Sequence, residues 1–197
     1  MLNPNLRHYR ALKAHLQENF TDEWYGPDAV VMERNSRDFA SRVDAINVNA
    51  RAVCHYLRSR CLSFQDPGAP PSSTSAFVIK KVFYPEWVTR ENYDICRRPG
   101  KDDNFGPLFS LTFVSLAASA AFYDALPCAK GPSLGTNFTL TCPYTLLAHY
   151  FELEWAAQYE VEEGLVRVSV GMECMEVLMG WFEKAVEAAE STALETA

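Results

Sequence analysis

The fold is decided by residues 130–173, KGPSLGTNFTLTCPYTLLAHYFELEWAAQYEVEEGLVRVSVGME. Ser133-Leu134-Gly135 forms a small turn that leads into a predicted strand over 135–141. A second apolar strand is predicted over 165–170, and it carries one charged residue, Arg167. A guanidinium stays charged, and its forked donors match a carboxylate or a phosphate. The segment therefore predicts two strands that carry an anion-binding arginine.

The rest of the chain alternates between helical and strand patterns. A helix is predicted from about residue 35, with a buried stripe of Phe39, Val43, Ile46, Ala50, Val53 and Leu57. Strands are predicted over 76–84 and 107–114, and helices over 115–126, after Pro143 and over 173–190. The last helix is expected to pack through Val177, Leu178, Trp181, Phe182 and Val186. This order favours an α+β fold in which a small, mostly antiparallel sheet is covered by helices.

The same pattern predicts three parts along the chain. Residues 1–34 are expected to form an N-terminal helical extension that begins at Asn3-Pro4, and residues 21–28 are read as a connection. Residues 35–190 are expected to form the main domain, and residues 191–197 a frayed tail.

Composition excludes some classes of function. The net charge of -7 argues against a nucleic-acid partner or an anionic membrane surface. No apolar run is long enough to cross a membrane, and the polar start of the chain does not resemble a signal peptide. The six cysteines lack the spacing of a metal or redox motif, which predicts reduced thiols and a cytoplasmic location. No metal site is expected.

Several motifs in order resemble the carboxy-terminal domain of the cystathionine gamma-synthase family, enzymes that depend on pyridoxal phosphate (PLP). The SLG turn and the LVRVSVG strand are joined by NVNARAV over 47–53 and VFYP over 82–85. The segments MERNSRDF, YPEWVTRENYDICRRPG and CPYTLLAHY look like the fungal branch. The resemblance covers roughly residues 30–190. It implies the C-terminal domain fold of fold-type I PLP enzymes, in which Ser133 and Arg167 would hold a substrate α-carboxylate.

The family's cofactor machinery has no counterpart in the sequence. None of the lysines (Lys13, Lys80, Lys81, Lys101, Lys130 and Lys184) has the context of the family's Schiff-base lysine. The glycine-rich phosphate loop and the ring-stacking tyrosine are not found either. PLP carries the carbanion chemistry of such enzymes. We therefore expect no cofactor on this chain alone, and no PLP activity of its own.

The candidate site residues each have a structural alternative. Arg167 is a candidate for substrate binding and catalysis, or it pairs with Glu160, Glu162 or Glu163, or points outward from an edge strand. Ser133 and Asn137 are candidates for substrate binding, or they form turns. His149 is a candidate acid or base, or a core histidine held by a backbone carbonyl. Cys142 is expected to be a buried thiol.

These residues leave open whether the chain is an enzyme. One hypothesis is catalysis without PLP, an isomerisation or cyclisation of a carboxylated or polyketide-like intermediate in a fungal-type specialised pathway. A second is a non-catalytic or regulatory partner of a full-length synthase. A third is one half of a split PLP enzyme that acts on O-acylhomoserine. The surface left by the absent large domain also predicts a homodimer.

Overall fold

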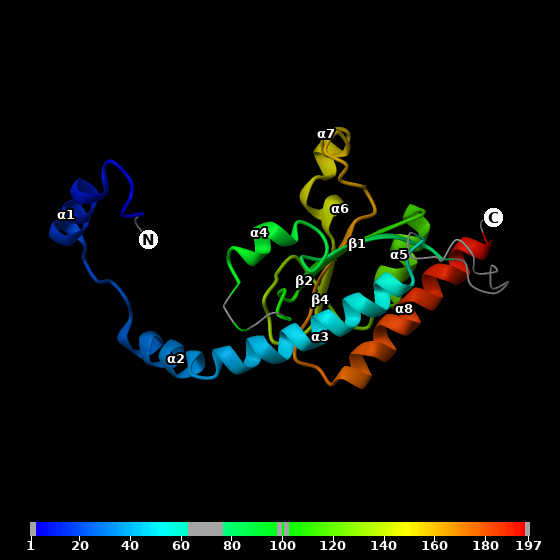
Figure 1. The fold of residues 1–197 in the computed structure, drawn as a ribbon, viewed down its shortest axis with the longest axis horizontal. Coiled ribbons are helices and arrows are strands. Elements are labelled where there is room, and N and C mark those ends of the chain that lie inside the picture. Colours follow the sequence, from blue (N-terminus) through cyan, green and yellow to red (C-terminus); the bar gives the residue numbers. More distant parts are fainter. Residues whose placement is uncertain (1–2, 63–76, 98–99, 101–102, 196–197) are drawn as a thin grey trace. The chain divides into compact units, whose positions relative to one another are not determined.

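The computed structural model describes residues 3–62, 77–97, 100 and 103–195 (Figure 1). By its internal contacts the chain divides into two compact units, Met1–Phe39 and Ala40–Ala197, which we call the amino-terminal unit and the main unit. The proline- and serine-rich segment 63–75 lies outside the described residues.

The amino-terminal unit contains two helices, α1 (Tyr9–Asn19) and α2 (Gly26–Ser36), and neither contains a buried residue. α1 begins later than the predicted start at Asn3-Pro4. The Asn3 side chain instead accepts a hydrogen bond from the Asn5 amide at 2.9 Å, and this local turn competes with the helix. The predicted connection over 21–28 ends early, because Pro27 sits in the first turn of α2.

The main unit begins with α3 (Phe39–Ser59), whose buried face confirms most of the predicted stripe. Ile46, Ala50, Val53 and Leu57 are all buried. Phe39 is half exposed, so the buried stripe starts at the third turn of the helix. Asn47 and Asn49 are buried on the same helix, where their amides bind backbone groups.

A five-stranded sheet forms the centre of the main unit, in the order β1-β2-β5-β4-β3. Its strands are β1 (Ile79–Phe83), β2 (Leu108–Phe113), β3 (Ala129–Lys130), β4 (Leu140–Pro143) and β5 (Val166–Ser169). All pairs are antiparallel except β3 with β4. The mostly antiparallel α+β fold is thereby confirmed. The strand with Arg167, β5, is central, so the edge-strand alternative for this arginine is wrong.

The predicted strand over 135–141 is correct only at its end. β4 starts at Leu140, and Gly135 has a left-handed φ of 75° that interrupts an extended strand. The amide of Gly135 donates to the Ser169 hydroxyl at 2.9 Å, whereas a strand residue would bond to a main-chain carbonyl of the neighbouring strand. The short strand β3 was not predicted.

Two helices close the core beside α3. α5 (Leu116–Ala125) is capped by the Ser115 hydroxyl, and α8 (Met175–Glu195) packs against it. Figure 1 shows α3 and α8 running alongside each other. The core unites α3, α5, α8 and the strands through Phe109, Phe122 and Phe182, among others. Val177 is exposed, contrary to the prediction, and α8 continues past residue 190 to Glu195.

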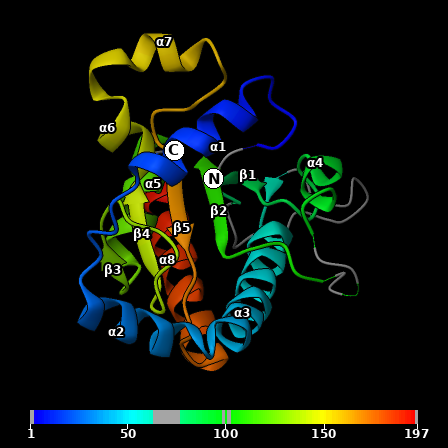
Figure 2. The ribbon, with the colours of Figure 1, turned by 90° about the vertical axis from the view of Figure 1, so that its left-hand side faces the viewer.

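The remaining helices are short. α4 (Arg90–Asp94) follows β1, whereas α6 (Tyr144–Ala148), the 3-10 turn η2 (Tyr150–Glu152) and α7 (Leu153–Ala157) project from one end of the sheet (Figures 1 and 2). The helix predicted after Pro143 is broken at His149, whose φ of -127° is not helical. In the described part of the chain, no helix combines the length and the apolar character that a membrane span needs.

Candidate functional site

Arg167 lies on the central strand and reaches the SLG turn. Its Nη2 donates a hydrogen bond to the carbonyl oxygen of Pro132, the residue before Ser133. The guanidinium carbon lies 5.0 Å from the centroid of the Tyr144 ring, a cation–π contact. The two sequence anchors are thus neighbours in space.

The segment between these anchors is held firmly to the end of β5. The carbonyl of Asn137 accepts from the Met172 amide at 2.8 Å, and the Thr139 hydroxyl accepts from the Gly171 amide at 3.0 Å. Glu173 accepts from the amide and the hydroxyl of Thr139 at 2.5 and 2.8 Å. The turn that faces Arg167 is tied to β5 as well, through the Gly135 amide on Ser169 and the Pro132 carbonyl on Arg167, which suits ligand binding because less ordering is needed.

Arg167 has no acidic partner among the described residues. Glu162, one of its predicted structural partners, instead pairs with Lys80 at 2.7 Å. Ser110 and Cys142 flank Arg167 on the neighbouring strands. The alternative in which a glutamate pairs with Arg167 is therefore wrong for the described part of the chain.

Ser133 and Asn137 lie on the segment that runs from the SLG turn to β4, and both are open to solvent. Neither side chain forms a hydrogen bond within the part of the chain that the structure describes. Their main chains shape the turn. A role of either side chain in binding stays a prediction.

His149 lies one aromatic ring away from Arg167. Its ring is 5.7 Å from that of Tyr144, edge to face, and its Nδ1 is 2.7 Å from the Glu152 carboxylate. The histidine is thus held by a carboxylate, not by the backbone carbonyl of the structural alternative. Tyr144, which contacts both candidates, was missed by the sequence analysis. No spacing in the sequence signals this role, because the contact depends on how α6 leaves β4.

Cys142 is buried, as predicted, and it is a poor nucleophile. Burial raises the pKa of its thiol, and the charge and hydrogen bond of Arg167 offset only part of that rise. Because the thiolate is the reactive form, this cysteine stays protonated near neutral pH.

The described lysines do not fit PLP. Lys130 donates to the carbonyls of Tyr123 and Leu126 at the end of α5, and Lys80 pairs with Glu162. Lys13 and Lys81 lie over the rings of Tyr9 and Phe83. Burial lowers the pKa of Lys130, but its amine already serves as a helix cap. Each of these four lysines is thus already in contact with another group of the chain. We therefore derive no step through this cofactor.

No metal site emerges from the described residues, since no three of their His, Cys, Asp or Glu side chains are grouped to hold an ion.

The chain is similar to fungal cystathionine gamma-synthases. No protein-family model matches it. It is 53% identical to the "Cystathionine gamma-synthase-like enzyme iboG2" of Amanita muscaria, with 96% of this chain and 31% of that protein aligned. It is 42% identical to the cystathionine gamma-synthase of Neurospora crassa, with 96% of this chain and 28% of that protein aligned. The chain thus spans about a third or less of the length of these relatives.

Solved structures give the same result. The cystathionine gamma-synthase of Xanthomonas oryzae pv. oryzae, in complex with cystathionine, matches with a TM-score of 0.62 and 25% identity. The match covers 81% of this chain and 37% of that one. Cystathionine gamma-lyase from yeast has the same fold, with a TM-score of 0.62. The chain therefore resembles the carboxy-terminal region of cystathionine gamma-synthases, as its motifs predicted.

Proposed function

We propose that this chain supplies the carboxylate-binding part of a cystathionine gamma-synthase-like site, with Arg167 as the binding residue. One observation carries the proposal. A charged side chain on the central strand has no acidic partner in the described chain, and it points at a fixed turn. Arg167 is half-buried, so its charge stays accessible to an anion, and a substrate carboxylate would pair with it.

The guanidinium has donors left for such a ligand. It carries five N–H groups, and the bond to Pro132 uses one of them. Two parallel N–H bonds to a carboxylate would fix the substrate in one orientation. Tyr144 supports the guanidinium from its ring face, so the arginine is positioned before the ligand arrives.

The substrate class follows from the relatives. The similar Xanthomonas enzyme was solved with cystathionine, so we propose that the ligand is an amino acid of this kind. The relatives are longer than this chain, and four of its described lysines have other contacts. In this proposal the carboxylate site works together with a PLP-binding large domain, on the same or on another polypeptide.

A titration of the 15N-labelled chain with L-cystathionine tests the binding site. We expect saturable shifts of the Gly135 amide and of the Arg167 Nε–H signal. His149→Gln should bind equally, since this residue does not touch the carboxylate in the proposal. Shifts confined to residues away from β5 and the SLG turn would refute it.

A second candidate is catalysis without PLP, and the pair of His149 and Glu152 favours it. In this proposal Arg167 and Ser133 bind a carboxylated or polyketide-like intermediate of a specialised pathway. His149 removes a proton from one substrate atom and returns it to another, giving an isomer or a ring. Glu152 orients the imidazole through its contact with Nδ1.

The two candidates separate in a turnover assay of the purified chain with a panel of unsaturated carboxylates and polyketide-like acids, followed by NMR. Catalysis requires a new isomer, and both His149→Gln and Arg167→Gln must lose at least about tenfold in rate. If both variants formed product at the rate of the parent chain, a catalytic role of His149 and Arg167 would be excluded. No product from any acid would leave the binding role as the better account.

A further inference from the structure

A pocket lies between α3 and the segment that precedes β2, and it shares no residue with the Arg167 site. Its lining residues are Val48, Arg51, Ala52, His55, Asp103 and Asn104, around a volume of about 470 Å³. The four residues from α3 recur at helical spacing and so form one wall. Small-molecule sites have volumes in this range.

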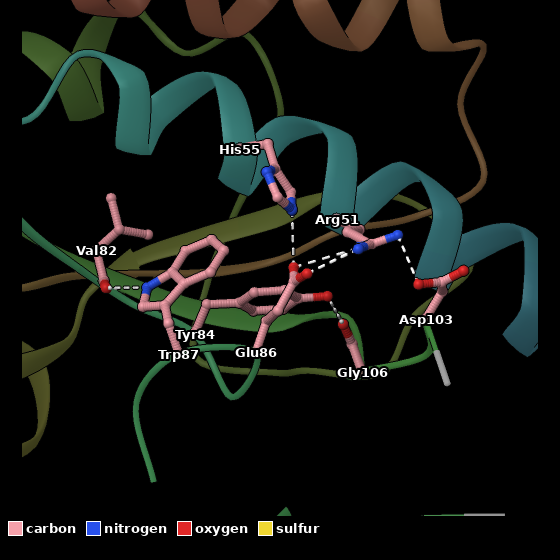
Figure 3. Close-up of polar contacts among 8 residues, drawn as sticks. All are labelled: Arg51, His55, Val82, Tyr84, Glu86, Trp87, Asp103 and Gly106. Atoms are coloured by element: carbon pink, nitrogen blue, oxygen red, sulfur yellow. Dashed lines mark hydrogen bonds and ion pairs between the residues drawn. The ribbon is translucent and has the colours of Figure 1, made fainter. Parts of the chain in front are cut away.

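A shared carboxylate fixes the polar side of this pocket. Glu86, in the turn after β1, accepts bonds from Arg51 at 2.8 and 3.1 Å and from the His55 Nε2 at 2.8 Å (Figure 3). Its side chain is 11% exposed. Burial raises the pKa of Glu86, but the hydrogen bonds and charges of Arg51 and His55 outweigh it and lower the pKa overall. Glu86 is therefore ionised, and it holds both side chains in place.

The wall opposite α3 is also tied down. The side-chain amide of Asn104 donates to the Asp44 carboxylate at 3.0 Å, and the main-chain amide of Gly106 donates to the side-chain oxygen of Asn47 at 2.7 Å. The Tyr84 hydroxyl donates to the Gly106 carbonyl at 3.2 Å (Figure 3). These bonds join the 104–106 segment to α3 and β1, so both walls are organised without a ligand.

The ion pair between Arg51 and Asp103 is weaker than the other polar contacts of the pocket. The Nη1 of Arg51, which Glu86 does not use, pairs with Asp103 at 2.8 Å (Figure 3). The Asp103 side chain is 75% exposed, and that of Arg51 is 35% exposed. An exposed ion pair of this kind contributes about 0–1 kcal/mol. It can open at little cost.

We propose that this pocket binds a free α-amino acid in its zwitterionic form, between Arg51 and Asp103. The ligand carboxylate takes the place of Asp103 on the Arg51 Nη1, and the ligand ammonium pairs with the released Asp103. Each half of the opened ion pair gains a new partner. The apolar surface of Val48 and Ala52 receives the ligand side chain.

The charges of the pocket select this class of ligand. Arg51 contributes one positive charge, whereas Glu86 and Asp103 contribute two negative ones. A simple anion would add a third negative charge, and a simple amine would leave the second donor edge of Arg51 unpaired. A zwitterion adds no net charge and pairs with both groups. Bound at this pocket, it would act as an effector and not as the substrate at Arg167.

Blocked amino acids test the proposal in the Arg167→Gln variant, which removes the other carboxylate site. The 15N-labelled protein is titrated with L-methionine, N-acetyl-L-methionine and L-methioninamide, and the Arg51 Nε–H and Asn104 signals are followed. We expect L-methionine to shift both signals, and each blocked form to bind at least about tenfold more weakly, one charged contact being lost. If N-acetyl-L-methionine bound as tightly as L-methionine, the pocket would be an anion site. If L-methioninamide bound as tightly, it would be a cation site. Either result overturns the proposal.

Two variants separate binding from folding. Asp103→Asn keeps the shape of an exposed residue and should weaken L-methionine binding about tenfold. Ala52→Phe fills the pocket without changing the ion pairs and should abolish the shifts. Unchanged affinity in either folded variant, or no shift with L-methionine in the parent protein, would refute the site.

Discussion

The Arg167 guanidinium donates to the main-chain carbonyl of Pro132, so the arginine of the central strand and the SLG turn form one unit. The bond uses a backbone oxygen, and it leaves the positive charge without a negative partner among the described residues. That combination agrees with the proposal that Arg167 binds an anionic ligand, since the guanidinium keeps donors for a carboxylate.

Gly171 is required where the SLG segment crosses the end of β5. A Cβ at this position would overlap the main chain of Phe138, which cannot move without breaking the bonds around Thr139. We expect Gly171→Ala to destabilise the chain by about 1–3 kcal/mol. Urea unfolding followed by circular dichroism measures the change.

Gly180 is the matched control, because a Cβ there meets no atom within 4 Å and the residue lies inside α8. Alanine favours a helix over glycine, so Gly180→Ala should stabilise by about 0.5–1 kcal/mol. Similar losses in both variants would show that the close approach at Gly171 does not matter.

The buried amide of Asn49 ties α3 to the end of the arginine strand. Its Nδ2 donates to the carbonyls of Gly171 and Glu173 at 3.0 and 2.9 Å. Asn49→Asp replaces the donor with an oxygen that faces two carbonyl oxygens, and we expect a loss of about 2–3 kcal/mol in unfolding free energy. The exposed Asn137→Asp should change it by less than about 0.5 kcal/mol. Equal stability of the two variants would contradict the role of Asn49.

Glu86 should make stability depend on pH. Its pKa is lowered in the folded chain, because the bonds from Arg51 and His55 outweigh its burial. The stabilisation is therefore fully present above the ordinary pKa of a glutamate and is lost as the pH falls through the lowered folded value. Glu86→Gln should be less stable than the parent at pH 7, by about 1.5–3 kcal/mol. Urea unfolding at pH 7 and at pH 3 checks this. The difference in unfolding free energy between the parent and Glu86→Gln should shrink toward pH 3, and a difference that widens would contradict the prediction.

The hydrophobic pattern of the sequence was sufficient to predict the main elements of the fold. The strands around Val82, Leu111 and Val168 and the helix around Phe182 were predicted, because each buries a regular apolar face. The segment 135–139 is predicted as strand together with residues 140–141, but only those last two residues belong to β4. Hydrogen bonds to Ser169 and Glu173, which are distant in sequence, hold residues 135–139 in an irregular form.

The site was only partly predictable. The resemblance to a family placed Ser133 and Arg167 together, and the structure has them as neighbours. The contact of Tyr144 with Arg167 and His149 depends on how α6 leaves β4, which no spacing reveals. The cluster of Arg51, Glu86 and Asp103 joins three segments through long-range ion pairs, and each residue alone looks like a solvated surface charge.

The central claim is that Arg167 binds a substrate carboxylate. The most direct measurement is the dissociation constant of L-cystathionine from the Gly135 amide shift, for the parent chain and for Arg167→Gln. Loss of a charged hydrogen-bond donor should weaken binding by at least about tenfold, while a thermal melt shows that the variant is folded. Equal dissociation constants in the two folded proteins would contradict the account.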